Sequence, residues 1–597
     1  MNILGKIKER ALADPARVAF HSQAGTISYG KLWDSSDRLA AWIDDRLGDD
    51  RKPIVVYGHK SPLMLVCFLA CAKSGRTYCP IDTCMSEGRV VSIVETVGNP
   101  LILATEDLEI PGYFVADNSV LSGAMNYDSK ISEDKWNKPE DTFYIIFTSG
   151  STGAPKGVQI TDENLSRYVD WSQTVGDSAD DKQGSTFLNQ APFSFDLSVM
   201  DTYTALATGC TLWGVDRMLQ KDVGKMLRFM KEGNLNYWVS TPSFADMCLA
   251  DPNFNSRLLP GMRQFMFCGE KLTKGTAEEL MDRFPDARVI NTYGPTESTV
   301  AVTSVEITRE MIAADRCLPI GQPKPGTEIR LIREDGTIAA HGGRGEIQIL
   351  GDTVSPGYYM NDIKTREVFS IIDCEDGMER AYRTGDEGFF GEDGMLYYVG
   401  RIDLQVKFHG YRIELGDIEN NLMKIDGVQA AAVVPKWNED KIRYLAAFVA
   451  SDNSEGSFED RKRIRETLKT MIPEYMVPKK VSFIDRLPRL TERDWRNWFN
   501  GIIHRFKFLR LCCCRRHPGI CSGNERKTYQ VLWICCHTGL RIYGHVQQTR
   551  SPCVPGGLLR IRVPFDTDIP GSAQKVRPQR RMVLVFPFVV PGAAHWQ

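Results

Sequence analysis

Short apolar runs alternate with helical patterns over residues 1 to about 400. Leu165, Tyr168 and Val169 share one helical face behind a predicted cap at Thr161. Other runs are rich in β-branched and aromatic residues, which is typical of buried strands: Pro53–Tyr57, Phe143–Phe147 and Arg288–Tyr293. Because this alternation is typical of layered α/β proteins, we expect a large α/β domain over residues 1–400.

The pattern changes after residue 400. A helix is predicted near Glu414–Lys424, with strands at Ala430–Val434 and Tyr444–Val449, which indicates a smaller α+β unit. We place a hinge at residues 401–405 and a small C-terminal domain at 406–491. A chain of 597 residues is too long for one ordinary core, which agrees with more than one domain.

Residues 492–597 form a tail without a sustained helical or strand pattern. From Arg493 on, 17 Lys and Arg oppose 4 Asp and Glu, a balance of +13. The whole chain carries −3, so residues 1–492 carry about −16. The tail also holds seven of the 16 cysteines and five of the nine histidines. We expect it to be disordered or aberrant.

The acidic body argues against nucleic acid as the main partner, since phosphate backbones require clustered cations. No run approaches the roughly 18 consecutive apolar residues of a membrane helix. The first residues lack the apolar core of a signal peptide, and the cysteines up to residue 490 are scattered singly. These features predict a cytoplasmic protein without membrane insertion.

The strongest chemical signal is the segment Thr148–Gly157, which reads Thr-Ser-Gly-Ser-Thr-Gly-Ala-Pro-Lys-Gly. Glycines allow backbone N–H groups to surround an anion, hydroxyls add donors, and a lysine adds a mobile cation. The residues concerned are Thr148, Ser149, Gly150, Ser151, Thr152, Gly153 and Lys156. With a strand predicted before it and a helix after it, we interpret the segment as a nucleotide-phosphate loop rather than a surface linker.

Three more motifs follow the loop: Asn291–Glu297, Tyr382–Asp386, and Gly400–Asp403 running on to Gly410–Glu414. In this order the four motifs resemble the adenylate-forming superfamily of acyl-CoA synthetases, luciferases and peptide-synthetase adenylation domains. The resemblance covers about residues 1–490. It implies ATP and Mg²⁺ as cofactors and a small C-terminal lid that rotates about Asp403 between two half-reactions.

The residue types at these motifs suit an ATP site. Tyr293 can stack on adenine, and Asp386 can accept hydrogen bonds from both ribose hydroxyls. Arg401 can hold the ribose or a phosphate, and Glu297 can hold Mg²⁺. The resemblance adds Asn291, Thr292, Gly294 and Thr296 to the ATP site, pairs Thr152 with Glu297 at the metal, and implies Lys156, Thr152, Glu297 and Arg401 as catalytic.

The segment Asn189–Asp201 resembles the D-alanine–D-alanyl carrier protein ligase branch of this superfamily. In that branch Asp196 would pair with the α-ammonium of the substrate, and a buried carboxylate rejects substrates that lack an amine. Asp196 could also cap the helix that follows, and the two roles are compatible. In that branch Cys268 and Val300 would shape a pocket for a methyl side chain, although Cys268 taken alone is more typical of an ordinary buried thiol at a strand end.

The resemblance implies a two-step reaction. ATP and D-alanine give D-alanyl-AMP and pyrophosphate, and the thiol of a phosphopantetheinylated D-alanyl carrier protein then displaces AMP, for lipoteichoic acid D-alanylation. Two alternatives stay open: a relic that binds ATP and amino acid without efficient turnover, and a peptide-synthetase-like ligase for another small amino acid.

The end of the lid departs from the family, which closes with Pro-x-Thr-x-Asn-Gly-Lys. Here Leu487–Thr491 begins that segment, but Trp495 stands where the lysine should be. Losing such a contact at a phosphorus centre typically costs about 10² to 10³ in rate, so activity is expected to be impaired. We hypothesise that residues 492–597 are a replaced C-terminus from out-of-frame translation or a misjoined gene. A metal-binding module or a basic tail for nucleic acid or a membrane surface is the alternative.

Overall fold

The computed structural model describes residues 1–149, 155–340, 342–374, 377–402, 405–408, 410–438, 441–451, 456–484 and 487, and the backbone of four strands between 528 and 587. Two compact units result, Met1–Ile503 and His504–Gln597. Gly150–Gly153, Asp403 and Trp495, which carry sequence predictions, lie outside the described residues.

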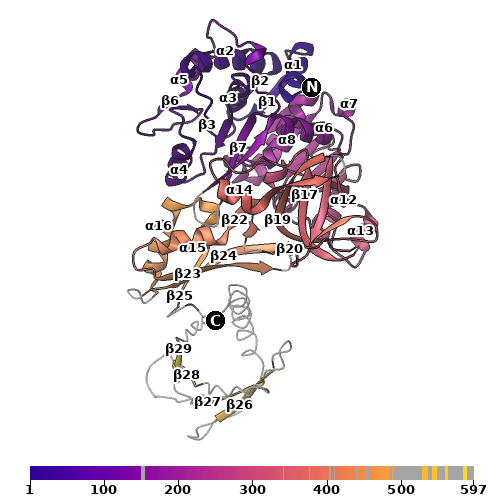
Figure 1. The fold of residues 1–597 in the computed structure, drawn as a ribbon. Helices are drawn as coiled ribbons and strands as arrows, with labels where there is room; N and C mark the ends of the chain where they lie inside the picture. Colours follow the sequence, from indigo (N-terminus) through magenta and orange to yellow (C-terminus); the bar gives the residue numbers. More distant parts are fainter. Residues whose placement is uncertain are drawn as a thin grey trace, which may run out of the picture. The chain divides into compact units, whose positions relative to one another are not determined.

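The first layer of the large domain is a six-stranded sheet in the order β6-β5-β3-β4-β7-β8. Figure 1 labels β3, β6 and β7 of this sheet. Every neighbouring pair is parallel except β7 and β8, which form an antiparallel hairpin. Parallel strands buried on both faces read as continuous apolar runs, which explains why they stood out in the sequence. The strands are β3 (Ile54–Tyr57), β4 (Tyr78–Ile81), β5 (Leu101–Ala104), β6 (Phe114–Ala116), β7 (Thr142–Thr148) and β8 (Lys156–Thr161).

The second layer is a nine-stranded sheet in the order β15-β14-β13-β12-β11-β9-β10-β1-β2. Its centre is parallel, and antiparallel pairs close both edges. The strands are β1 (Val18–Ser22), β2 (Gly25–Ser28), β9 (Thr186–Asn189), β10 (Thr211–Gly214), β11 (Tyr237–Ser240), β12 (Gln264–Phe267), β13 (Arg288–Tyr293), β14 (Thr303–Glu306) and β15 (Gln322–Pro323).

Helices cover and separate these two sheets. All twelve residues of α8 are buried, as expected for a helix that is apolar on most sides. The helices of the large domain are α1 (Ile3–Ala13), α2 (Tyr29–Leu47), α3 (Pro62–Lys73), α4 (Glu87–Val97), α5 (Asn118–Ala124), α6 (Asp162–Ser172), α7 (Ala179–Lys182), α8 (Leu197–Thr208), α9 (Arg217–Gln220), α10 (Val223–Glu232), α11 (Pro242–Leu249), α12 (Lys274–Arg283), α13 (Arg309–Ala313) and α14 (Asp362–Val368). Short 3₁₀ turns lie at η1 (Glu133–Lys135) and η2 (Thr296–Ser298).

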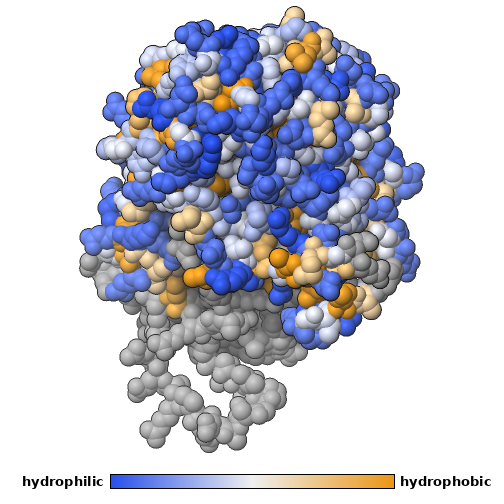
Figure 2. Space-filling model, turned by 45° about the horizontal axis from the view of Figure 1, so that its top comes forward, coloured by the Kyte–Doolittle hydropathy of each residue, from blue (hydrophilic) through white to orange (hydrophobic). Residues whose placement is uncertain are grey.

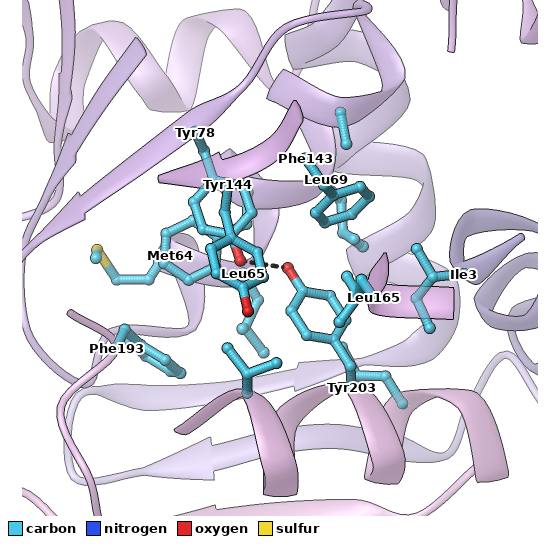
Figure 3. Close-up of a cluster of buried hydrophobic side chains, with 14 of the residues drawn as sticks. Ile3, Met64, Leu65, Leu69, Tyr78, Phe143, Tyr144, Leu165, Phe193 and Tyr203 are labelled. Carbon is cyan, nitrogen blue, oxygen red and sulfur yellow. Dashed lines mark hydrogen bonds between the residues drawn. The ribbon is translucent and has the colours of Figure 1, made fainter. Parts of the chain in front are cut away.

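An aromatic core joins the six-stranded sheet to α8 (Figure 3). The hydroxyls of Tyr78 on β4 and Tyr203 on α8 are 2.7 Å apart, so both buried phenols have a partner. The ring of Phe68 stacks on Tyr78 with centroids 4.2 Å apart, and Phe193 meets Phe68 edge-on at 5.5 Å. The loop that carries Phe193 is therefore anchored in this core.

A third sheet holds part of the predicted ATP site. Its order is β16-β17-β19-β18, with β20 paired to the far part of the long strand β19. Asp386 on β19 lies directly opposite Arg401 on β20. The strands are β16 (Thr327–Ile332), β17 (Arg344–Gly351), β18 (Phe369–Cys374), β19 (Gly377–Phe390) and β20 (Leu396–Arg401).

The small C-terminal domain, called the lid below, has its own apolar core. A two-stranded hairpin precedes a helix and a three-stranded sheet in the order β23-β24-β25. Its elements are β21 (Gln405–Phe408), β22 (Tyr411–Glu414), α15 (Leu415–Met423), β23 (Ala430–Asn438), β24 (Lys441–Ala450), α16 (Phe458–Met471), η3 (Glu474–Met476) and β25 (Lys480–Ile484).

The second unit contains four strands that the tail's irregular pattern did not predict. They form an antiparallel sheet in the order β26-β27-β28-β29. The strands are β26 (Thr528–Ile534), β27 (Arg541–Gln547), β28 (Leu558–Arg562) and β29 (Val583–Pro587). Each is a short run that contains several apolar residues. The runs are too short for an alternation of apolar and polar residues to be recognised among the neighbouring Pro, Gly and Cys residues.

The predicted class, a large α/β domain with a small α+β lid, is confirmed. The cap at Thr161 is confirmed as well, since its hydroxyl accepts from the backbone N–H of Asn164 in a capping box. The strand β8 was not predicted: it lies between the phosphate loop and α6, which begins at Asp162 behind the predicted cap. β8 is stabilised by its pairing with β7, and the pattern of apolar residues within β8 itself does not reveal this pairing.

No helix in the described part of the chain is long and apolar enough to cross a membrane. On the face shown in Figure 2, hydrophilic residues cover most of the surface and hydrophobic residues gather in small groups.

Candidate active site

The phosphate loop connects the two strands of the β7–β8 hairpin. Thr148 and Lys156 are paired across its base. The hydroxyl of Thr148 is buried, and no described residue lies within hydrogen-bond distance of it. A buried hydroxyl without a partner among the described residues fits a position where a bound anion would complete the bonding.

Ser149 contacts the lid. Its hydroxyl donates to the carbonyl of Arg412 at 2.8 Å and accepts from the N–H of Glu414 at 3.2 Å. On the other side of the loop, Arg89 of α4 donates to the carbonyl of Thr148 at 3.2 Å and lies 3.3 Å from a carboxylate oxygen of Asp417 on α15. The hairpin β21–β22 is thus docked against the phosphate loop in this structure.

Lys156 also faces the lid. Its ammonium is 3.8 Å from a carboxylate oxygen of Glu414 and 5.3 Å from the ring centroid of Tyr358. Burial lowers the pKa of Lys156, and the neighbouring Arg412 guanidinium lowers it further, whereas Glu297 and Glu414 oppose the shift. The lysine lies among carboxylates from both domains, which suits a cation that must reach a negatively charged ligand.

Glu297 is fully buried on η2, and its carboxylate contacts side chains from both the large domain and the lid. One carboxylate oxygen accepts from Arg412 at 2.6 Å and the other accepts from the Tyr358 hydroxyl at 2.8 Å. Burial would raise its pKa, but Arg412 and Lys156 outweigh burial and hold the pKa at about 2. Glu297 is therefore ionised at every physiological pH and has the chemistry of a divalent-cation ligand.

Tyr293, Asp386 and Arg401, which the sequence predicts as ATP contacts, lie side by side in the structure. The Tyr293 hydroxyl donates to one oxygen of Asp386 at 2.6 Å, and Arg401 donates to the other at 2.9 Å. Arg401 also donates to the carbonyl of Thr384 at 2.7 Å. This network fixes the carboxylate, and each of its oxygens keeps a further lone pair to accept from a ligand hydroxyl.

The remaining predicted ATP-site residues lie beside Tyr293 in the chain. Tyr293, these neighbours, Asp386 and Arg401 are called the Tyr293 wall below. Asn291 donates to the carbonyl of Pro319 at 2.7 Å, and Thr292 donates to that of Phe267 at 2.9 Å, so their side chains brace the backbone. Gly294 is required sterically, because a Cβ there would lie 2.5 Å from the Cα of Ala301.

Asp196, Cys268 and Val300 converge beside this wall. Asp196 occupies the N-cap position of α8 but makes no capping hydrogen bond, so the capping role that the sequence also allowed is not used. Burial raises its pKa, opposed by a hydrogen bond from Thr296. The thiol of Cys268 lies 3.6 Å from the carbonyl of Val300, and Val300 adopts φ +68°. Positive φ at a β-branched residue is strained, and such strain concentrates at functional sites.

A cavity of about 520 Å³ lies between the large domain and the lid, next to Tyr293 and Arg401. Tyr293, Arg401 and Gly269 line it from the large domain, and Lys407, Trp437 and other residues line it from the lid. The ammonium of Lys407 lies 5.8 Å from the ring centroid of Tyr293. The space is large enough for a ligand of drug size and reaches from the Tyr293 wall to the lid.

Aromatic contacts hold the lid in this position. The rings of Tyr411 and Tyr475 stack with centroids 3.6 Å apart, and Phe195 of the large domain meets Tyr411 edge-on at 4.8 Å. The N–H of Gly410 donates to Glu270 at 2.7 Å. The hairpin that carries the last of the four sequence motifs therefore forms one side of the site.

Two family profiles cover most of the chain up to residue 493. The AMP-binding enzyme profile matches residues 7–359, and the AMP-binding enzyme C-terminal domain profile matches residues 417–493. The chain belongs to the AMP-binding enzyme family. Enzymes of this family use ATP, and this AMP-binding enzyme is an ATP-dependent, AMP-forming ligase.

Two relatives carry the name D-alanine–D-alanyl carrier protein ligase. The protein from Bacillus licheniformis is 42% identical over 492 residues, which cover 82% of this chain and 96% of the relative. The protein from Bacillus cytotoxicus is 42% identical over 515 residues, which cover 85% of this chain and 99% of the relative. This AMP-binding enzyme therefore spans nearly the whole length of both.

Solved structures share the fold. The Vibrio cholerae adenylation domain AlmE, in complex with glycyl-adenosine-5′-phosphate, matches with a TM-score of 0.69 and 22% identity over 84% of this chain and 98% of its own. The protein PA1221, which contains adenylation and PCP domains, matches with a TM-score of 0.72 and 24% identity over 84% of each chain.

Sequence reasoning assigned no role to three residues that the structure places in the site. Arg412 and Lys407 lie on the lid hairpin, and Tyr358 lies in a loop of the large domain. Arg412 belongs to the motif Gly410–Glu414, which was the available signal. Tyr358 had no signal, because only the fold brings it to Glu297.

Proposed function

We propose that this AMP-binding enzyme activates D-alanine as D-alanyl-AMP and transfers it to the phosphopantetheine thiol of a D-alanyl carrier protein, for lipoteichoic acid D-alanylation. The observation that carries the proposal is the grouping of Asp196 with Cys268 and Val300 beside the Tyr293 wall. A buried carboxylate beside the small side chains of Cys268 and Val300 suits an amino acid with a methyl side chain. The names of the two Bacillus relatives agree.

In the first step, a carboxylate oxygen of D-alanine attacks the α-phosphorus of ATP and pyrophosphate leaves. The phosphate loop, with the buried hydroxyl of Thr148 and the ammonium of Lys156, would hold the phosphates. Asp386 and Arg401 would hold the ribose against Tyr293. Glu297 and Thr152 would hold Mg²⁺, which neutralises charge on the leaving pyrophosphate.

In the second step, the carrier thiolate attacks the carbonyl carbon of the adenylate, the C–O bond to phosphate breaks, and AMP leaves. The docked lid suits this step. With Arg412 on Glu297, the carboxylate that would hold Mg²⁺ in the first step is already neutralised after pyrophosphate has gone. The cavity along Lys407 and Trp437 would admit the pantetheine arm.

We place the reaction in the cytoplasm, where ATP is available. The nine described cysteines are all free thiols, which fits a reducing compartment.

Trp495 favours a second candidate, a protein that binds ATP and D-alanine but forms the adenylate inefficiently. The same site serves both candidates. They differ only in the rate of the first step.

Transfer to the carrier tests the proposed function. The full chain is incubated with ATP, Mg²⁺ and labelled D-alanine in the presence of phosphopantetheinylated or unmodified D-alanyl carrier protein. We expect hydroxylamine-labile label on the phosphopantetheinylated carrier alone, because only a thiol forms a labile thioester. Equal labelling of both carriers would contradict the transfer step. No labelling, with D-alanine and ATP still bound, would favour the second candidate.

A further inference from the structure

We propose that Lys60 is a positioning residue for the substrate amine: its buried ammonium fixes the loop that presents Asp196. This rests on the proposed role of Asp196 and adds a residue about which the sequence motifs say nothing. Lys60 lies between β3 and α3, in the six-stranded layer, whereas the loop it holds follows β9 in the nine-stranded layer.

The ammonium of Lys60 binds the loop at three points. It donates to the side-chain oxygen of Asn189 and, at 2.6 Å, to the carbonyl of Ala191. It also lies 4.4 Å from the ring centroid of Phe193. Only 3% of Lys60 is exposed, so these contacts replace water almost completely. One cation thereby fixes alternate residues of the loop that ends at Asp196.

The start of the loop is also tied to the helix that follows Asp196. Asn189 donates to a carboxylate oxygen of Asp201 at 2.7 Å and lies 3.4 Å from the Thr202 hydroxyl. Because Lys60 occupies the side-chain oxygen of Asn189, the amide is held in the orientation that reaches α8. The loop between Asn189 and Asp201 is therefore closed on itself, with Asp196 in the middle.

The other end of Lys60 is equally constrained. Its carbonyl accepts from the Ser22 hydroxyl on β1 at 2.6 Å. Phe193 in turn packs edge-on against Phe68 in the aromatic core, and Figure 3 shows it at the margin of that cluster. The loop is therefore tied to β1 through Lys60 and to α3 through Phe193.

A positioning role explains why a charge is kept in this interior. Burial lowers the pKa of Lys60, and the carboxylate of Asp201 opposes the shift. Replacing a buried ionic group by an apolar one of similar volume is often neutral for stability, so stability alone does not account for the ammonium. A methionine could fill the space but could not hold Asn189 and Ala191.

The test compares Lys60→Met with Lys73→Met. Lys73 is a matched control because its ammonium is equally buried, binds Asp37 at 2.7 Å, and lies away from the loop. Binding of D-alanine is measured by calorimetry with a non-hydrolysable ATP analogue present, and binding of the analogue is measured separately. We expect Lys60→Met to weaken D-alanine binding at least about 10-fold with nucleotide binding unchanged, and Lys73→Met to change neither.

Unchanged D-alanine affinity in Lys60→Met, or an equal loss of nucleotide and D-alanine binding, would overturn the positioning role. If Lys60→Met does not fold, Asn189→Ala removes the same link from the loop side and is expected to show the same selective loss. Wild-type protein that binds the nucleotide but not D-alanine would overturn the proposed function instead.

Discussion

Asp196→Ala is expected to abolish detectable D-alanine binding while the affinity for ATP stays within about twofold. The substrate ammonium would enter a buried site without its counter-charge, and leaving one partner of such a pair unpaired costs about 2–5 kcal/mol. That corresponds to an increase in the Kd for D-alanine of about 30-fold to several thousand-fold. Calorimetry with D-alanine and, separately, with ATP measures both.

Asp162→Asn is the matched control for this prediction. Asp162 is also buried, on α6, where burial raises its pKa to about 7, but it does not line the site. The control is expected to bind D-alanine like the wild type. If Asp196→Ala retains D-alanine affinity, Asp196 does not hold the amine.

Replacing residues 492–597 by the closing segment of the family, Asn-Gly-Lys included, is expected to accelerate adenylate formation by about 10² to 10³. The lysine that the resemblance places at the α-phosphate would then be present, where Trp495 now stands. The burst of D-alanyl-AMP in a single turnover measures the effect, since this step precedes the carrier.

A control chain carries the same replacement but has methionine in place of that lysine. It separates the effect of the added ammonium from the effect of removing residues 492–597. It is expected to stay at the rate of the present chain. Equal rates for the lysine and methionine versions would mean that the missing ammonium does not limit the first step.

The sequence predicted the parts of the site that consist of contiguous motifs. Tyr293, Asp386 and Arg401 come from separate motifs and meet within hydrogen-bond distance. Cys268 and Val300 come into contact in the same way. Tyr293 and Arg401 end the strands β13 and β20, and Cys268 directly follows β12, whereas Asp386 lies within β19 and Val300 lies in the turn before β14.

Contacts that depend on tertiary packing were not predictable. Lys60 directly precedes the helix cap at Ser61, a position typical of a surface lysine, yet it is buried because the loop after β9 encloses its ammonium. Tyr358 reaches Glu297 only through the fold of its loop. The whole segment Asn189–Asp201 resembles the D-alanine branch, which pointed to Asp196. The residue that supports Asp196, Lys60, belongs to the other sheet layer and could not be read from that segment.

ATP–pyrophosphate exchange with a panel of D- and L-amino acids tests the central claim most directly. Adenylate formation is reversible, so labelled pyrophosphate enters ATP only in the presence of the amino acid that the site activates. We predict exchange above background with D-alanine, at a low rate because of Trp495, and less with L-alanine, glycine and D-serine. A stronger response to any other amino acid would contradict the assignment of D-alanine.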